Sequence, residues 1–171
     1  MVKLGEIFAR RSIRKYTSEP VSKEDTEKLL QAAMAAPSAG NRKPWHFITI
    51  TDRENLNEIA EKHPYAKMMY DAPLCIVVCD DPSVRTPSAP HSFAFQDCAA
   101  ATMNILHAAV GLGLGAVWLG LGSESLEELV RELFGVPEDV LPISLVVIGH
   151  PDEQKEPRTQ YDDNRVHTEK W

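Results

Sequence analysis

The chain has 171 residues, of which 43% are hydrophobic and 25% are charged. This composition is that of one ordinary globular domain, which buries roughly 70% of the surface that its unfolded chain exposes. The formal net charge of −7 disfavours nonspecific nucleic-acid binding, because clustered cations hold a phosphate backbone. We therefore expect no nucleic-acid partner, and any site for an anion must be a local positive cluster.

The N-terminus lacks the apolar stretch of a secretory signal, and no segment approaches the roughly 20 apolar residues that a membrane helix needs. We expect a cytoplasmic protein with no membrane partner. Cys75, Cys79 and Cys98 have no CxxC or Cys/His ligand spacing, and the six histidines show no metal-binding pattern. No disulfide framework and no metal site are expected.

Two amphipathic helices open the chain. The first is predicted over residues 3–11, with apolar residues spaced i, i+3, i+4 at Leu4, Ile7 and Phe8. The second follows Ser22, which together with Asp25 resembles a capping box, and Pro37 stops it.

Strands and helices then alternate. A short helix follows its cap Asp52, a central helix rich in small residues covers 92–110, and a third helix begins at Ser125 with Glu128 and ends at Gly135. The alternation by itself predicts a parallel, doubly wound sheet. The predicted strands, rich in β-branched and other apolar residues, are 45–51, 74–79, 116–119 and 143–148.

A basic segment follows the first helix. Arg10, Arg11, Arg14 and Lys15, with Ser12, place four cations and a hydroxyl within six positions of an acidic chain. Guanidinium groups are suited to phosphate oxygens. The alternative is that the arginines only complement the negative end of the helix and lie in water.

Two further segments carry candidate binding residues. The stiff loop 36–45 could present Ser38 and Asn41 to a planar heterocycle, or could be a turn with capping side chains. Glycines at 111, 113 and 115 follow a helix and precede a strand, the reverse of a dinucleotide-binding turn. Trp118 stands near the end of that strand, either beside a ligand or in the core.

No hydrolytic centre is indicated. Ser38 lacks a GxSxG context, and no Ser/His/Asp or Cys/His arrangement is apparent. Gln96 and Asp97 are interpreted as a helix-end charge or a polar packing pair, without a catalytic role.

Taken in order, five motifs resemble those of the nitroreductase family of flavin mononucleotide (FMN) enzymes, over nearly the whole chain. The motifs are residues 10–14, 36–45, 96–101, 113–118 and 155–158.

The resemblance implies an α+β fold: a three-layer α/β/α domain with a mainly antiparallel central sheet, which overrules the parallel sheet. It implies an obligate homodimer with flavin sites at the interface. One domain spans 1–171, with a core over 1–150 and a polar C-terminal extension, 151–171, that crosses the partner subunit.

The resemblance also implies the cofactor site. Arg10, Arg11, Ser12 and Arg14 match a segment that contacts phosphate and ribityl groups, and Arg158 matches a further phosphate contact. Some members carry an asparagine in the segment here written 63–70, which has none, and Arg165 lies near enough to compete with Arg158. The remaining matches are Pro37, Ser38 and Asn41, brought to the flavin from the other subunit, and Trp118, Leu119 and Gly120, beside the isoalloxazine ring.

The implied reaction is ping-pong. NADH or NADPH gives a hydride to flavin N5, and a nitroaromatic, a quinone or a similar small acceptor then takes the electrons. The cofactor carries this chemistry, so no catalytic side chain is required. The alternatives are a reductive dehalogenase or flavin-consuming enzyme on the same scaffold, and a dimer that stores or senses flavin.

Overall fold

The computed structural model describes residues 4–84 and 93–171. A four-stranded sheet lies at the centre, with neighbouring strands antiparallel throughout, in the order β1-β2-β4-β3. The antiparallel sheet expected from the family resemblance is confirmed, and the parallel sheet expected from alternation alone is wrong. The strands are β1 (Trp45–Ile50), β2 (Leu74–Asp80), β3 (Gly115–Gly120) and β4 (Leu141–Gly149).

The connection between β1 and β2 explains the strand direction. A single crossover helix returns the chain to the start of the preceding strand and produces a parallel pair. Here α3 (Arg53–Lys62) is followed by a further segment that ends in the 3-10 helix η2 (Lys67–Tyr70). The second segment brings the chain back, so that Cys75 pairs with Ile50 at the end of β1.

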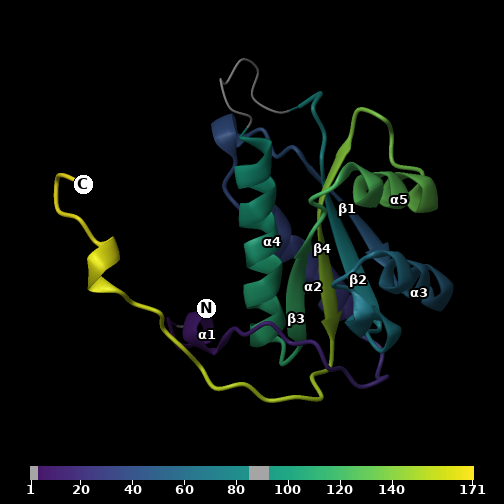
Figure 1. The fold of residues 1–171 in the computed structure, drawn as a ribbon, viewed down its shortest axis with the longest axis horizontal. Coiled ribbons are helices and arrows are strands. Elements are labelled where there is room, and N and C mark those ends of the chain that lie inside the picture. Colours follow the sequence, from purple (N-terminus) through teal and green to yellow (C-terminus); the bar gives the residue numbers. More distant parts are fainter. Residues whose placement is uncertain (1–3, 85–92) are drawn as a thin grey trace.

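Helices cover both faces of the sheet (Figure 1). The helices α2 (Lys23–Met34) and α4 (Ala94–Gly111) lie on one side, and α3 and α5 (Glu124–Phe134) lie on the other. The buried β2 strand serves both layers, since Ile76 belongs to the α2/α4 core and Val77 to the α3/α5 core. The three-layer α/β/α prediction is confirmed.

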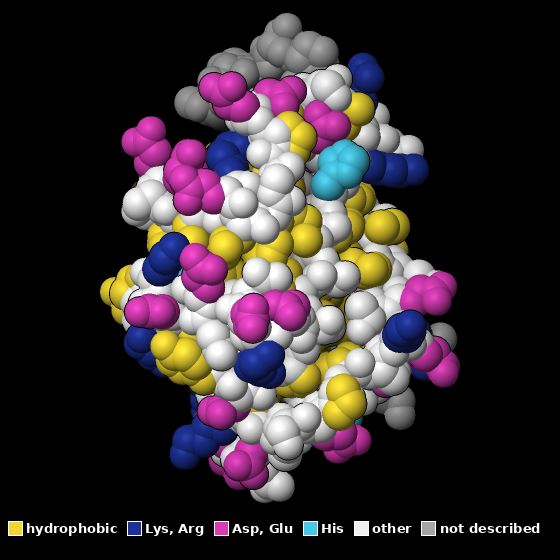
Figure 2. Space-filling view, turned by 90° about the vertical axis from the view of Figure 1, so that its right-hand side faces the viewer, with side chains coloured by type: hydrophobic (Ala, Val, Ile, Leu, Met, Phe, Trp, Pro, Cys, Tyr) yellow, Lys and Arg dark blue, Asp and Glu magenta, His cyan; other side chains and the backbone are white. Residues whose placement is uncertain are grey.

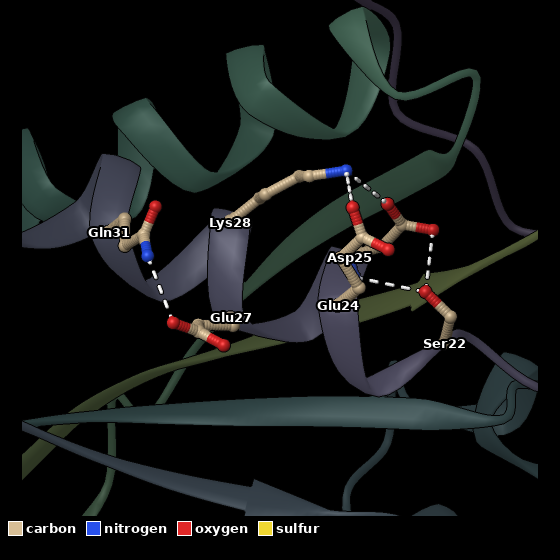
Figure 3. A network of polar contacts seen from close by, with 6 residues as sticks. All are labelled: Ser22, Glu24, Asp25, Glu27, Lys28 and Gln31. Atoms are coloured by element: carbon tan, nitrogen blue, oxygen red, sulfur yellow. Dashed lines mark hydrogen bonds and ion pairs between the residues drawn. The ribbon is translucent and has the colours of Figure 1, made fainter.

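The predicted cap of α2 is confirmed (Figure 3). Ser22 Oγ accepts a hydrogen bond from the Asp25 backbone N–H at 3.0 Å and donates one to Asp25 Oδ2 at 2.8 Å. Lys28 pairs with Glu24 at 2.8 Å one turn later. The bond from the Asp25 N–H satisfies one of the backbone donors that the first turn of a helix leaves free, and it fixes where α2 starts.

The predicted start of α5 is wrong. The N-cap is Ser123, whose extended backbone (φ −145°, ψ 148°) suits that position, and Ser125 lies inside the first turn. The predicted end is confirmed, because Gly135 takes the left-handed conformation at φ 63°. The described part of the central helix begins at Ala94, and its predicted start at Ser92 lies outside the described residues.

The first helix, α1 (Leu4–Ala9), ends two residues before its predicted end, and the predicted residue 3 lies outside the described ranges. The chain leaves the helix to run beside β3, where the Ile13 N–H donates to Ala116 O at 3.0 Å. The apolar stripe of α1 is exposed: Leu4 is 66% and Ile7 44% accessible. The stripe therefore lies outside the core of this single chain.

The C-terminal tail pairs with the N-terminal segment before it leaves the body of the molecule (Figure 1). Backbone hydrogen bonds join Thr17 to His150, Asp152 to Lys15 and Arg158 to Phe8, at 2.9–3.1 Å. Beyond them the chain extends away and includes the 3-10 helix η3 (Asp163–Arg165). Apolar anchors on this stretch, Tyr161 and Trp171, are exposed.

Candidate functional site

The principal candidate site is a cavity of about 490 Å³ at the end of β3. Such a volume is within the usual range for small-molecule and cofactor sites. Its walls come from three separate segments: the end of β3, the N-terminal segment and the connection between α3 and η2. The lining residues are Arg14, His63, Pro64, Tyr65, Lys67, Met68, Trp118, Leu119 and Gly120.

The β3 wall contains the three residues predicted from the sequence. Leu119 is buried, while Trp118 is 37% exposed and forms part of the cavity lining. Trp118 is therefore not a core residue, and its contact with a ligand stays a prediction. Gly120, the last residue of β3, has no side chain, so a flat ring can approach the backbone closely beside the aromatic surface of Trp118.

The wall formed by residues 63–68 was missed from the sequence, where this segment attracted notice only because it lacks an asparagine. Its position depends on Arg53, whose guanidinium donates to Met69 O, Tyr70 O and Ala72 O at 2.7, 2.9 and 2.7 Å. Three carbonyls around one guanidinium hold η2 against α3. A signal that could have found this wall is Lys67, a cation that precedes a buried strand.

The basic segment is bound to the C-terminal tail. The Arg11 guanidinium donates to Glu156 O, and Lys155 Nζ donates to Ser12 O at 2.6 Å. Glu153 accepts from the Arg14 backbone N–H at 2.6 Å, which lowers the pKa of its carboxyl group. Because this last bond uses only the backbone, the Arg14 guanidinium remains available to the cavity.

The predicted phosphate residues do not all meet in one cavity. Arg11 lines a separate hollow of about 200 Å³ together with Lys155. Arg10 lies close to α4, where burial first, and the Arg10 charge second, lower the pKa of His107. The positive cluster therefore spreads from the β3 cavity along the junction of the N-terminal segment and the tail.

The two candidate tail arginines differ in their contacts. Arg158 joins α1 through its backbone N–H, which donates to Phe8 O at 3.1 Å, and its side chain is exposed. Arg165 pairs with Asp162 at 3.1 Å. Neither side chain lines the β3 cavity in this single chain.

The loop predicted to reach a flavin lies at a different cavity, of about 560 Å³, beside the start of α4. Pro37 and Ser38 line it together with Gln96 and Asp97. Asn41, in the 3-10 helix η1 (Ala39–Asn41), has a left-handed backbone with φ 55°. The structure thus does not bring this loop to the β3 cavity within one chain.

Asp97 holds that loop in place. Its Oδ1 accepts the Ala39 N–H at 2.9 Å, although the side chain is only 6% exposed. Ser38 Oγ accepts the Lys43 N–H at 2.9 Å and stabilises the same turn. Asp97 fits both interpretations, since it lies in the first turn of α4 and packs against the loop backbone.

In the part of the chain that the structure describes, neither the buried thiols nor a cluster of metal-ligating side chains forms an alternative reactive centre. Burial raises the pKa of Cys79 to about 11 and of Cys98 to about 12, so neither is a reactive thiolate near neutral pH. In ranges 4–84 and 93–171, no three His, Cys, Asp or Glu side chains are grouped to hold a metal ion. No helix in these ranges is long and apolar enough to cross a membrane.

Comparisons with known proteins are consistent over the whole chain. The family model described as "Nitroreductase family" matches residues 7–64 and 58–150. A protein of Archaeoglobus fulgidus, with the provisional name NADH dehydrogenase/NAD(P)H nitroreductase, is 46% identical over 172 residues, or 98% of each chain.

Two solved structures have the same fold. A protein of Parabacteroides distasonis, with that same provisional name, has a TM-score of 0.92 and 38% identity, and the match covers 98% of both chains. An FMN-dependent nitroreductase of Clostridium difficile has a TM-score of 0.89 and 28% identity, and the match covers 99% of this chain and 100% of the other. The order of motifs, the antiparallel three-layer fold and these matches together show that the chain belongs to the nitroreductase family.

Proposed function

We propose that this protein is an FMN-dependent NAD(P)H oxidoreductase that acts as a homodimer. The observation that carries the proposal is the β3 cavity, which combines the exposed face of Trp118 and the backbone of Gly120 with cations at Arg14 and Lys67. An apolar, aromatic wall suits a tricyclic ring, and cations at its rim suit a ring that gains negative charge on reduction.

The basic segment would hold the phosphate of the cofactor. Ser12 pairs with Ala116 of β3, and Arg14 reaches the cavity two residues later. For a flavin ring beside Trp118, the guanidinium groups that would bind its phosphate therefore lie in the same short segment that brings Arg14 to the cavity. Arginine is suited to this contact, because its planar fork can bind two phosphate oxygens at once.

A second subunit would complete the site. Pro37, Ser38 and Asn41 do not reach the β3 cavity of their own chain, so their predicted flavin contacts require a partner. The exposed apolar side chains of α1 and the tail that stands away from the body supply surfaces that a partner could cover (Figure 1). Arg158 would likewise act across the interface.

The proposed roles of the side chains rest on the family resemblance, and within one chain Arg14 is the phosphate residue that lines the β3 cavity. Arg10, Arg11, Ser12, Arg14 and Arg158 bind phosphate, and the residues of β3 orient the ring. Bound flavin would supply hydride and electron transfer between NAD(P)H and the acceptor in a ping-pong sequence. The β3 wall of the cavity would cover one face of the ring and exclude water from it, and the two substrates would use the other face in turn.

A small oxidised molecule such as a nitroaromatic or a quinone is the proposed acceptor.

A nucleic-acid role has no support from the α3/α5 face, where Lys and Arg are interspersed with Asp and Glu and form no basic patch (Figure 2). The alternatives on the same scaffold are reductive dehalogenation, consumption of free flavin, and storage or sensing of flavin without turnover.

The first test is the visible spectrum of the purified protein after addition of FMN. Bound flavin and steady NADH or NADPH oxidation with a quinone are expected. A protein that takes up no FMN would overturn the proposal, whereas FMN binding without turnover would favour storage or sensing. Product analysis with halogenated phenols and with free flavin separates the other two activities.

The second test replaces Arg10 and Arg14 with alanine. Each charge-assisted contact contributes roughly 1.5–3 kcal/mol, so FMN affinity should fall by about 100-fold or more in the double variant. Lys28→Ala with Lys62→Ala removes the same charge from exposed sites on α2 and α3 and serves as the control. Equal FMN affinity in the two double variants would contradict the phosphate role.

A further inference from the structure

His63 is a buried histidine in the wall of the β3 cavity. It is the C-cap residue of α3, where its backbone N–H donates to Ile59 O at 2.9 Å, and the residue is only 2% exposed. A polar ring buried to this degree is costly unless its nitrogens are hydrogen-bonded. The contacts of both ring nitrogens therefore matter for the position of the wall.

The two ring nitrogens have partners on different segments. The Tyr65 backbone N–H donates to Nδ1 at 3.1 Å, and Nε2 lies 3.2 Å from Gly120 O. Because Nδ1 accepts a hydrogen bond, it carries no proton, and Nε2 must be the protonated nitrogen that donates to Gly120 O. Both bonds are satisfied at once only by the neutral Nε2–H tautomer.

The Nε2 bond joins two walls of the same cavity, and the Nδ1 bond holds the ring within its own wall. Gly120 ends β3 directly after Trp118 and Leu119, and Tyr65 lies in the turn that leads to Lys67. At the other end of this turn, the Arg53 guanidinium holds the carbonyls of Met69, Tyr70 and Ala72. The 63–72 segment is thus fixed at both ends by side chain to backbone bonds.

We infer that His63, as the neutral Nε2–H tautomer, is a positioning residue that fixes the separation between the end of β3 and the 63–68 wall. The effect of His63 on cofactor binding rests on the proposed function, since the separation of the two walls decides how a flat ring fits beside Trp118. His63 acts through Gly120 and the turn, and its ring needs no contact with cofactor or substrate. Tyr65, 75% exposed, remains free to meet a ligand.

Two amide variants separate the bonds. The glutamine amide reaches the position of Nε2, so His63→Gln keeps a donor to Gly120 O. The asparagine amide reaches only the position of Nδ1, so His63→Asn keeps the acceptor for Tyr65 and loses the link to β3. His46→Gln is the matched control, because the His46 side chain is 65% exposed on β1, away from the cavity.

The ligand-free readout is nuclear magnetic resonance of ¹⁵N-labelled protein. We expect long-range proton–nitrogen spectra at neutral pH to show the Nε2–H tautomer at His63, assigned from its loss in His63→Gln. The indole N–H signal of Trp118 should shift in His63→Asn but not in His63→Gln. A ring protonated at Nδ1, or an indole signal that shifts equally in both variants, overturns the inference.

The ligand-bound readout is the dissociation constant for FMN. His63→Gln and His46→Gln should stay within about twofold of the original protein, while His63→Asn should weaken binding about fivefold or more, the effect of one lost hydrogen bond. Equal weakening in the two His63 variants overturns the inference. If His63→Asn does not fold, the tautomer and the FMN titration of His63→Gln still decide. If neither the original protein nor any variant binds FMN, the proposed function fails, while the spectra still test the role of His63.

Discussion

Gly115 lies at the contact on which the basic segment depends. A Cβ atom added there would stand 2.7 Å from Ile13 Cγ2 and 2.9 Å from Ile13 Cβ, closer than side-chain atoms normally approach. Ile13 is buried and β-branched, so it has little freedom to rotate away, and its N–H bonds Ala116 O at 3.0 Å. Gly115→Ala must therefore displace the segment that carries Ser12 and Arg14.

The expected cost has two parts. Overpacking of a filled core costs typically 1–3 kcal/mol, and loss of the Ile13 hydrogen bond about 0.5–1.5 kcal/mol more. A total near 2–4 kcal/mol corresponds to a melting temperature lower by about 5–15 °C for a chain of this length. FMN affinity should fall as well, because Arg14 moves with the displaced segment.

Thermal unfolding and FMN titration of Gly115→Ala measure both effects. Gly111→Ala is the control, because no heavy atom lies within 4 Å of a Cβ added at Gly111, which is the last residue of α4. The stability of this variant should stay level or rise slightly. Ile13→Ala in the Gly115→Ala background removes Cγ2, the nearest atom in conflict, and leaves Cβ at 2.9 Å, so it should relieve part of the clash and the two changes should be non-additive. A Gly115→Ala protein as stable as the original would refute this reasoning.

The remaining predictions concern stability, pH and assembly. Arg53→Met should lower the free energy of unfolding by about 2–4 kcal/mol in a denaturant titration, because three carbonyls lose a charged donor, whereas a loss below about 1 kcal/mol would contradict its role in holding η2. Burial raises the pKa of Cys98 to about 12 from 9.0, so the thiol ionises first in the unfolded chain, and the free energy of unfolding should fall as pH rises from about 9 towards 12. Cys98→Ala should flatten this alkaline slope in urea titrations. An unchanged slope would exclude the thiol as its cause. Ile7→Glu with Phe8→Glu should convert the proposed dimer to monomer in analytical ultracentrifugation, since both side chains are exposed on α1, and an unchanged sedimentation coefficient would place the interface elsewhere.

Local elements of this fold were predictable because their signals are local. The Ser22 cap, the Gly135 stop and the apolar run of β2 each depend on residues close in sequence, and the structure confirms them. The start of α5 was misjudged because Ser123 and Ser125 are equivalent as residue types, and only the extended backbone at Ser123 makes it the cap. Strand direction was misjudged from alternation because the order strand, helix, strand does not show whether the chain crosses the sheet once, which makes the strands parallel, or crosses and returns, which makes them antiparallel.

The sequence by itself determined the elements, the positive segment near the N-terminus and, through the order of its motifs, the family. The tertiary structure decided which predicted residues share a cavity: it joins Arg14 to Trp118, Leu119 and Gly120, and it places Pro37 and Ser38 at another cavity. It also revealed the wall held by His63 and Arg53, whose partners are distant backbone carbonyls. A carbonyl is present at every residue and leaves no mark in a sequence, so contacts of this kind appear only once the chain is folded.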